Sequence, residues 1–266
     1  MTRSPGRRLF LAAVMLFLAA PLLVVAGVSV NAQRQLLFPP RGFSLRWYGE
    51  LLAQSDWLNA LKNSLVIATS SAALAVAVAF PLAWFLWRYR VRHARLLWAL
   101  GVAPFTLPPV VTALGFLVFW ISVGLYGAMP ATIVSHAIFF LTLPLVTISL
   151  GLESIDRQLL EAAATLGADD GATFRTIVLP LLRPYLISGY AFAFVLSLNE
   201  YIIAYMVAGF TVETLPIKIF NSLRYGYTPV MAAVSVLFVL VAGLIFGLIA
   251  RFGDLPKLLG AYAGRD

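Results

Sequence analysis

The chain has 266 residues, of which 61 % are hydrophobic, 11 % are charged and none is cysteine. Soluble domains carry about a quarter charged residues, so this composition excludes a water-soluble fold and indicates an integral membrane protein. The lack of cysteine excludes disulfides and any thiolate nucleophile or metal ligand. The net charge of +8 is typical of the cytoplasmic loops of a membrane protein, so we do not assign it to nucleic-acid binding.

Six stretches are long and apolar enough to cross a hydrocarbon core, which takes about 20 residues. They lie near residues 9–30, 64–87, 96–122, 130–152, 185–208 and 228–250. The first follows three arginines and is longer than the apolar core of a signal peptide, so we interpret it as an uncleaved anchor. The turn sequence GLYGAMP separates the third from the fourth. The expected fold is one all-α transmembrane domain over residues 1–266.

Orientation follows from the basic residues. With the N-terminus inside, 13 of the 19 Lys and Arg residues fall on the inner side, which predicts that both termini are cytoplasmic. In the outer segment 31–63, the residues Phe43, Trp47, Leu51 and Leu52 recur at helical spacing and predict short surface helices. These helices either pack against the bundle or offer a docking surface to an outside partner, and the sequence leaves both interpretations open.

The inner segment 153–183 is polar, although it lies between two long uncharged runs. Its first half predicts an amphipathic helix with an apolar face formed by Leu159, Leu160, Ala163 and Leu166. Gly167 can end this helix, because glycine readily adopts the left-handed conformation. Asp169 or Asp170 can then cap a second helix, which Pro180 would end or kink.

A spaced pattern runs through this segment. It begins with Glu161, Ala162 and Ala163. After three further residues comes Gly167, and after nine more the pattern closes with Ile177, Leu179 and Pro180. The pattern resembles the coupling loop of ABC importer inner-membrane permeases. The stretches LPPVVTALG (107–115), FVLSLNEYIIAYMVAG (194–209) and TLPIKIFNSLRYGYTPVMAAVSVL (214–237) resemble the spermidine/putrescine permease group, and the likeness covers about residues 43–250.

The resemblance implies the type I ABC importer permease fold, with six spans and a cytoplasmic coupling loop, in the bacterial inner membrane. It also implies two permease subunits, identical or different, two cytoplasmic ATPase subunits that bind ATP and Mg²⁺, and a periplasmic solute-binding protein. The chain itself lacks G-x-x-x-x-G-K-[ST], so we expect it to bind no cofactor and to be no enzyme. The residues of the pattern, together with Asp169, would contact the ATPase.

The solute is less closely defined than the family. The group that the chain resembles carries polyamines, whereas near relatives take aminoethylphosphonate or iron complexes. Two alternatives from other classes are a secondary carrier or channel and an intramembrane hydrolase. The first would be expected to bury more carboxylates than this chain does, and the second would need a nucleophile–base pair. Ser135 adjoins His136, but neighbours on a helix point apart.

Glu200 is the one carboxylate well inside a predicted span, so it faces either the solute path or a structural partner, for which Lys218 and Arg224 are candidates. Asn199 and Tyr201 flank it. The adjacent residues Pro108 and Pro109 free backbone carbonyls near the middle of the third span, which suits a wall of the path or a simple packing kink. His136 is expected to be hydrogen-bonded in the bundle, and we expect no metal site.

Overall fold

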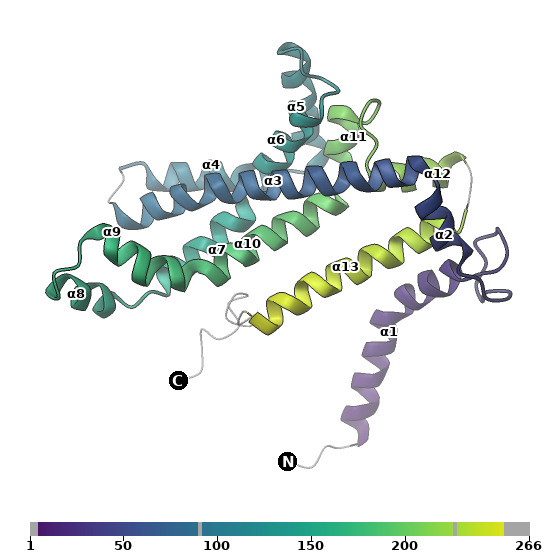
Figure 1. Cartoon of the computed structure of the whole chain (residues 1–266), viewed down its shortest axis with the longest axis horizontal. Coiled ribbons are helices and arrows are strands. Elements are labelled where there is room, and N and C mark those ends of the chain that lie inside the picture. Colours follow the sequence, from purple (N-terminus) through teal and green to yellow (C-terminus); the bar gives the residue numbers. More distant parts are fainter. Residues whose placement is uncertain (1–4, 90–91, 226–227, 253–266) are drawn as a thin grey trace. The chain divides into compact units, whose positions relative to one another are not determined.

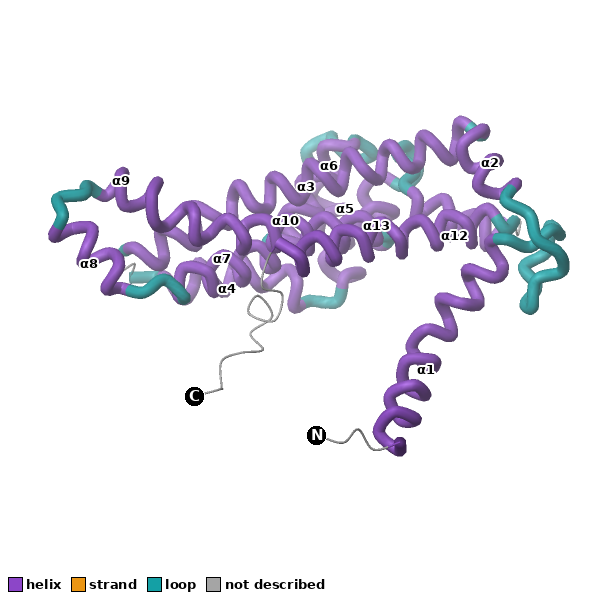
Figure 2. The backbone as a smooth tube through the Cα atoms, turned by 60° about the horizontal axis from the view of Figure 1, so that its bottom comes forward, coloured by secondary structure: helices purple, strands orange, loops and turns teal. Residues whose placement is uncertain are grey.

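The computed structural model describes residues 5–89, 92–225 and 228–252 (Figure 1), and Figure 2 shows that their regular structure is helical. The chain divides into two compact units. One contains residues 1–60 and 218–243, and the other contains residues 61–217 and 244–266. The unit boundaries pass through three helices: α3 (Ser55–Arg88), α12 (Leu215–Tyr225) and α13 (Val230–Phe252).

The first unit begins with α1 (Pro5–Ser29), which is long and apolar enough to cross a membrane. The connection to α2 (Arg46–Ala53) is organised around Asn31, whose side chain is buried and accepts the backbone N–H groups of Gln33 and Arg41. The indole of Trp47 donates to the Asn31 carbonyl at 2.6 Å. The predicted short helix is therefore confirmed, although its predicted apolar face is divided. Trp47 and Leu51 are buried, whereas Phe43 and Leu52 are exposed.

The second unit holds most of the described helices. After α3 these are α4 (Ala94–Thr106), α5 (Pro109–Ser122), α6 (Met129–Phe140), α7 (Thr142–Glu153), α8 (Arg157–Thr165), α9 (Asp170–Thr173), the π-helix Phe174–Val178, α10 (Leu179–Asn199) and α11 (Ile202–Ala208). The closest packing joins α7 to α10. A Cβ atom added at Gly189 would lie 2.6 Å from Thr147 Oγ1 and 2.7 Å from Pro144 Cα. Glycine thus lets the two backbones approach as helices in membranes commonly do.

Within the described residues, three continuous helices are long and apolar enough to span a membrane: α1, α3 and the helix Asp170–Asn199. Two further spans would each consist of a bent pair, α6 with α7 at 42° and α4 with α5 at 105°. The described apolar part of α13, Val230–Ile245, is shorter than the others. The structure therefore supports a multi-pass helical protein without confirming the count of six.

Two predicted spans differ in detail from the structure. The third is interrupted at Pro108 and Pro109, as the sequence predicted. The chain turns by 105° there, because both prolines lack N–H groups and Leu107, before them, takes the extended conformation. The fifth, predicted at 185–208, begins earlier and stops at Asn199. The remainder of that stretch forms the separate short helix α11.

Candidate functional site

The segment that follows α7 begins with a capped helix and a glycine corner. Asp156 accepts the backbone N–H of Gln158 at 2.9 Å and so caps α8. At the other end Gly167 has a φ of +82°. The N–H groups of Gly167 and Ala168 donate to the carbonyls of Ala164 and Ala163, both at 3.0 Å, which forms a Schellman turn. The glycine corner predicted from the sequence is confirmed.

The second helix of the segment starts at Asp170 and continues through a π-helical turn into α10. Asp169 is one of the two residues predicted to cap this helix, and its side chain accepts the Ala172 N–H at 2.6 Å. The following turn is a π-helix, in which Leu179 donates to the Phe174 carbonyl five residues earlier. The sequence predicted that Pro180 would end or kink the helix, and the helix does not end there. This wider turn comes directly before the proline, whose ring would clash in a regular helix, and α10 continues to Asn199.

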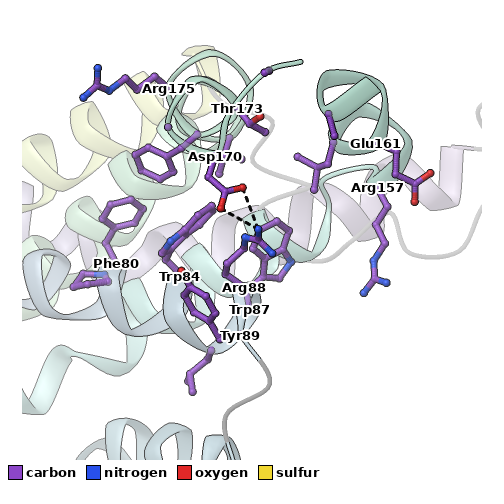
Figure 3. Close-up of a pocket in the computed structure, with 18 of the residues that line it drawn as sticks. Phe80, Trp84, Trp87, Arg88, Tyr89, Arg157, Glu161, Asp170, Thr173 and Arg175 are labelled. Atoms are coloured by element: carbon purple, nitrogen blue, oxygen red, sulfur yellow. Dashed lines mark hydrogen bonds and ion pairs between the residues drawn. The ribbon is translucent and has the colours of Figure 1, made fainter. Parts of the chain in front are cut away.

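The segment is also fastened to α3. The Phe174 ring packs edge-on against Trp84 with centroids 4.9 Å apart, and it lies 6.0 Å from Phe80. Asp170 forms an ion pair with Arg88 at 3.1 Å (Figure 3). Both charged groups are exposed, so the pair contributes at most about 1 kcal/mol and the aromatic rings carry most of the attachment. Movement of the segment would therefore reach α10 through the backbone and α3 through side chains.

A cleft of about 1370 Å³ lies between the end of α3 and this segment. Trp84, Trp87 and Phe174 line it together with Arg88 and Asp170. In Figure 3 the side chains of Arg157 and Arg175 point away from the Arg88–Asp170 pair. These three arginines of the cleft therefore do not converge on one point.

The residues of the sequence pattern fall into two groups. Glu161 and Ala162 are exposed on α8, whereas Ile177, Leu179 and Pro180 are half-buried at the start of the long helix. The predicted apolar face of α8 is only partly covered: Ala163 is buried, Leu160 is half-buried, and Leu159 and Leu166 are 48 % and 88 % exposed. The first part of the segment thus presents acidic and apolar side chains outward.

A second site lies at the break between α10 and α11. Glu200 is extended, with φ −74° and ψ 128°, and ends α10. Its carboxylate turns toward the next helix and accepts the N–H groups of Ile203 at 2.9 Å and Ala204 at 3.0 Å. A carboxylate at this position satisfies backbone donors and favours the positive end of the helix. Glu200 therefore holds the start of α11.

The side-chain partner of Glu200 is His136, a pairing that the sequence analysis did not predict. His136 Nε2 lies 3.1 Å from Glu200 Oε2, and His136 Nδ1 lies 2.8 Å from Ser197 Oγ. The side chains of His136 and Glu200 are 1 % and 8 % exposed. The expected hydrogen bonding of His136 is confirmed, and the structural partner is this imidazole rather than Lys218 or Arg224. Lys218 instead lies 3.7 Å from the Asp56 carboxylate.

The remaining candidate residues lie at two separate breaks. Asn199 donates to the Val195 carbonyl at 2.8 Å, and the ring of Tyr201 stacks on that of Tyr205 with centroids 5.4 Å apart. Both belong to the break at Glu200. Pro108 and Pro109 are exposed at the other break, between α4 and α5. The breaks are linked through packing, since α11 packs against α5 and α6.

Comparison with known proteins identifies the family. Residues 75–254 match the model of the binding-protein-dependent transport system inner membrane component. The chain is 35 % identical over 257 residues to the putrescine transport system permease protein PotI of Escherichia coli K12, covering 94 % of this chain and 91 % of PotI. It is 31 % identical over 242 residues to the spermidine/putrescine transport system permease protein PotC of Haemophilus influenzae, covering 91 % of this chain and 94 % of PotC.

Solved structures agree on the fold. A chain of the MetNI methionine ABC transporter aligns with a TM-score of 0.63 at 19 % identity, and the alignment covers 73 % of this chain and 93 % of that chain. A chain of a bacterial ABC transporter involved in alginate import aligns with a TM-score of 0.69 at 17 % identity, and the alignment covers 95 % of this chain and 99 % of that chain. The capped corner, the long helix behind it and these likenesses agree, and the chain therefore belongs to the family of binding-protein-dependent transport system inner membrane components, the permeases of ABC importers.

Proposed function

We propose that this chain is the permease subunit of an importer for a polyamine or a related organic cation, and that it forms half of the translocation path. The observation that carries the proposal is the 35 % identity to a putrescine permease over 94 % of the chain. A relative with another solute, a probable molybdenum transporter permease of Haloferax volcanii, is 33 % identical over only 69 % of the chain. Full-length similarity thus favours the cationic solute.

The buried carboxylate of Glu200 supports the same solute class. A carboxylate held inside a membrane protein offsets part of the hydration that an ammonium group loses there. We assign the solute path to the break at Glu200, with Asn199 and Tyr201 beside it, and to the break at Pro108 and Pro109. At both places a helix is interrupted, which a membrane protein tolerates where the backbone lines a watery cavity or is covered by protein.

The coupling loop is proposed as the contact with the ATPase subunits. Its exposed part carries Glu161 and Ala162, and the glycine corner and the Asp169 cap fix its shape. The proposed assembly has two ATPase subunits that bind ATP and Mg²⁺, a second permease chain and a periplasmic binding protein. The energy of ATP hydrolysis would enter through the loop, so this chain needs no catalytic group of its own.

Uptake in cells tests the solute. The chain is expressed with its ATPase, partner permease and binding protein in a bacterial host that lacks its own polyamine importers. We expect ATP-dependent uptake of radiolabelled putrescine or spermidine, and no uptake when the ATPase carries an inactivating substitution at its phosphate-binding lysine. Uptake of molybdate or aminoethylphosphonate without any uptake of polyamine would refute the proposed solute class.

Thiol labelling tests the orientation. The chain has no cysteine, so single cysteines at Leu166 and Tyr126, which are 88 % and 41 % exposed, report two loops separately. In cells that express the permease without the ATPase, a membrane-impermeant maleimide added outside should label Tyr126→Cys and should label Leu166→Cys only after lysis. Labelling of Leu166→Cys in intact cells would contradict the cytoplasmic placement of the coupling loop.

A further inference from the structure

Four buried or nearly buried side chains from three segments form one hydrogen-bonded chain. Ser71 Oγ on α3 lies 2.9 Å from Ser197 Oγ on α10, and Ser197 Oγ lies 2.8 Å from His136 Nδ1 on α6. His136 Nε2 then lies 3.1 Å from Glu200 Oε2. At its far end Ser71 Oγ is also 3.2 Å from the Ala68 carbonyl oxygen. Hydroxyl groups donate and accept, and an imidazole nitrogen does either according to its protonation.

With a neutral imidazole, the hydrogen bonds run toward Glu200. Ser71 donates to Ser197, Ser197 donates to His136 Nδ1, and His136 Nε2–H donates to the carboxylate. Every hydroxyl and N–H hydrogen of these three side chains has an acceptor in this arrangement. The group of four then carries the single negative charge of Glu200.

With a protonated imidazole, the two hydrogen bonds on the Nδ1 side run in the opposite direction. His136 Nδ1–H donates to Ser197, Ser197 donates to Ser71, and Ser71 donates to the Ala68 carbonyl at 3.2 Å. Nε2–H still donates to Glu200, so no buried hydrogen loses its acceptor, a loss that would otherwise be costly. The site now carries no net charge. Two hydroxyl rotations therefore accommodate one added proton.

Among the described helices around this hydrogen-bonded network, the other charged residues lie well away from it along the helices. On α3, Lys62 is the charged residue nearest in sequence to Ser71, and it precedes Ser71 by nine residues, or about 14 Å of helix. The helices that pack most extensively against α6 are α4, α5, α7, α10 and α11. Of these, α5 and α11 have no charged residue, and α4, α7 and α10 carry Arg95, Glu153 and Arg183 at or near their ends. On α10, Arg183 precedes Ser197 by 14 residues, or about 21 Å of helix. The titratable rings near Glu200, Tyr201 and Tyr205, stack on each other. Glu200 is thus the charged group that the imidazole contacts.

We propose that His136 sets the charge of the Glu200 site and thereby makes cation uptake dependent on pH. While His136 is neutral, Glu200 offers a full negative charge to an ammonium group. When His136 is protonated, the imidazolium neutralises that charge and the solute is held more weakly. The proposal rests on the proposed import of an organic cation, and it makes His136, Ser197 and Ser71 positioning residues for Glu200.

The test is uptake per assembled transporter in proteoliposomes, with the same pH on both sides, between pH 5.5 and 8.0. Saturating binding protein is loaded with putrescine, and uptake is divided at each pH by that of His93→Gln, which changes the only other histidine of the chain. This division removes the pH dependence of the ATPase and of the binding protein. We expect His136→Gln to retain its donor to Glu200, to lose the titration and to exceed the control about tenfold at the acid end.

Ser71→Ala provides a second measurement that a structural role alone would not move. Without Ser71, the Ser197 hydroxyl lacks an acceptor when His136 is protonated, so the imidazolium form is disfavoured. The midpoint of the acid loss of uptake should fall by about one pH unit, because a lost buried hydrogen bond is worth roughly that much. Retention of the control's pH profile by both His136→Gln and Ser71→Ala would overturn the inference, whereas absence of putrescine uptake by the His93→Gln control at every pH would refute the proposed function itself.

Discussion

Replacing Gly167 by proline is expected to reduce ATP-driven uptake more than tenfold while the chain remains in the membrane. The native φ of +82° is closed to proline, whose ring holds φ near −65°. Proline also removes the N–H that donates to the Ala164 carbonyl. Because α8 and the helix behind it meet at this corner, both change direction when it is lost, and the loop no longer fits the ATPase. Uptake and ATPase co-purification measure the effect.

Gly171→Ala is the matched control for this prediction. Gly171 lies in the first turn of the second helix, and an added Cβ would meet only Asp169 Oδ1 at an ordinary 3.4 Å. We expect this variant to transport normally. Glu161→Lys reverses an exposed charge without disturbing the corner and should weaken ATPase association as well. Normal uptake by both Gly167→Pro and Glu161→Lys would remove the coupling assignment from this loop.

Gly189→Ala is expected to have the largest effect on stability. Its Cβ would come within 2.7 Å of the Pro144 Cα atom, which belongs to the backbone of α7 and cannot rotate away. Forcing the helices apart should cost about 1–3 kcal/mol, and it also loosens the neighbouring Thr147 contact. We expect less folded permease in detergent extracts and a lower Tm for what remains.

The same substitution at Gly115 separates packing from helix propensity. Among the described residues, no atom lies within 4 Å of a Cβ at Gly115 on α5. Alanine favours a helix over glycine by about 1 kcal/mol, so Gly115→Ala should leave the Tm unchanged or raise it. Equal thermal stability of the two variants would show that α7 and α10 do not need glycine between them.

Local chemistry explains which features could be predicted. Apolar runs located the main helices, and Gly167 and Asp169 could be assigned because a left-handed corner and an N-terminal cap depend on neighbouring backbone atoms. The course of the helix past Pro180 could not be predicted, because the π-turn that accommodates the ring depends on hydrogen-bond register. The pairing of Glu200 with His136 joins residues 64 positions apart, so it depends on how the helices pack. The rarity of ionisable groups in the spans was an available signal, because it singles out Glu200 and His136, whereas the sequence analysis proposed Lys218 and Arg224 as partners.

The Glu200–His136 pair also bears on the order in which the protein is made. His136 leaves the ribosome 64 residues before Glu200, which is about 3–13 s at ordinary rates of synthesis. The imidazole can thus already be in the bilayer when the carboxylate arrives. Glu200 can then form its hydrogen bond with His136 as it enters the lipid. Its insertion is thereby coupled to correct docking of α10 on α6 and α7. A nascent chain with no hydrogen-bond donor at position 136 would present Glu200 to the insertion machinery without this partner.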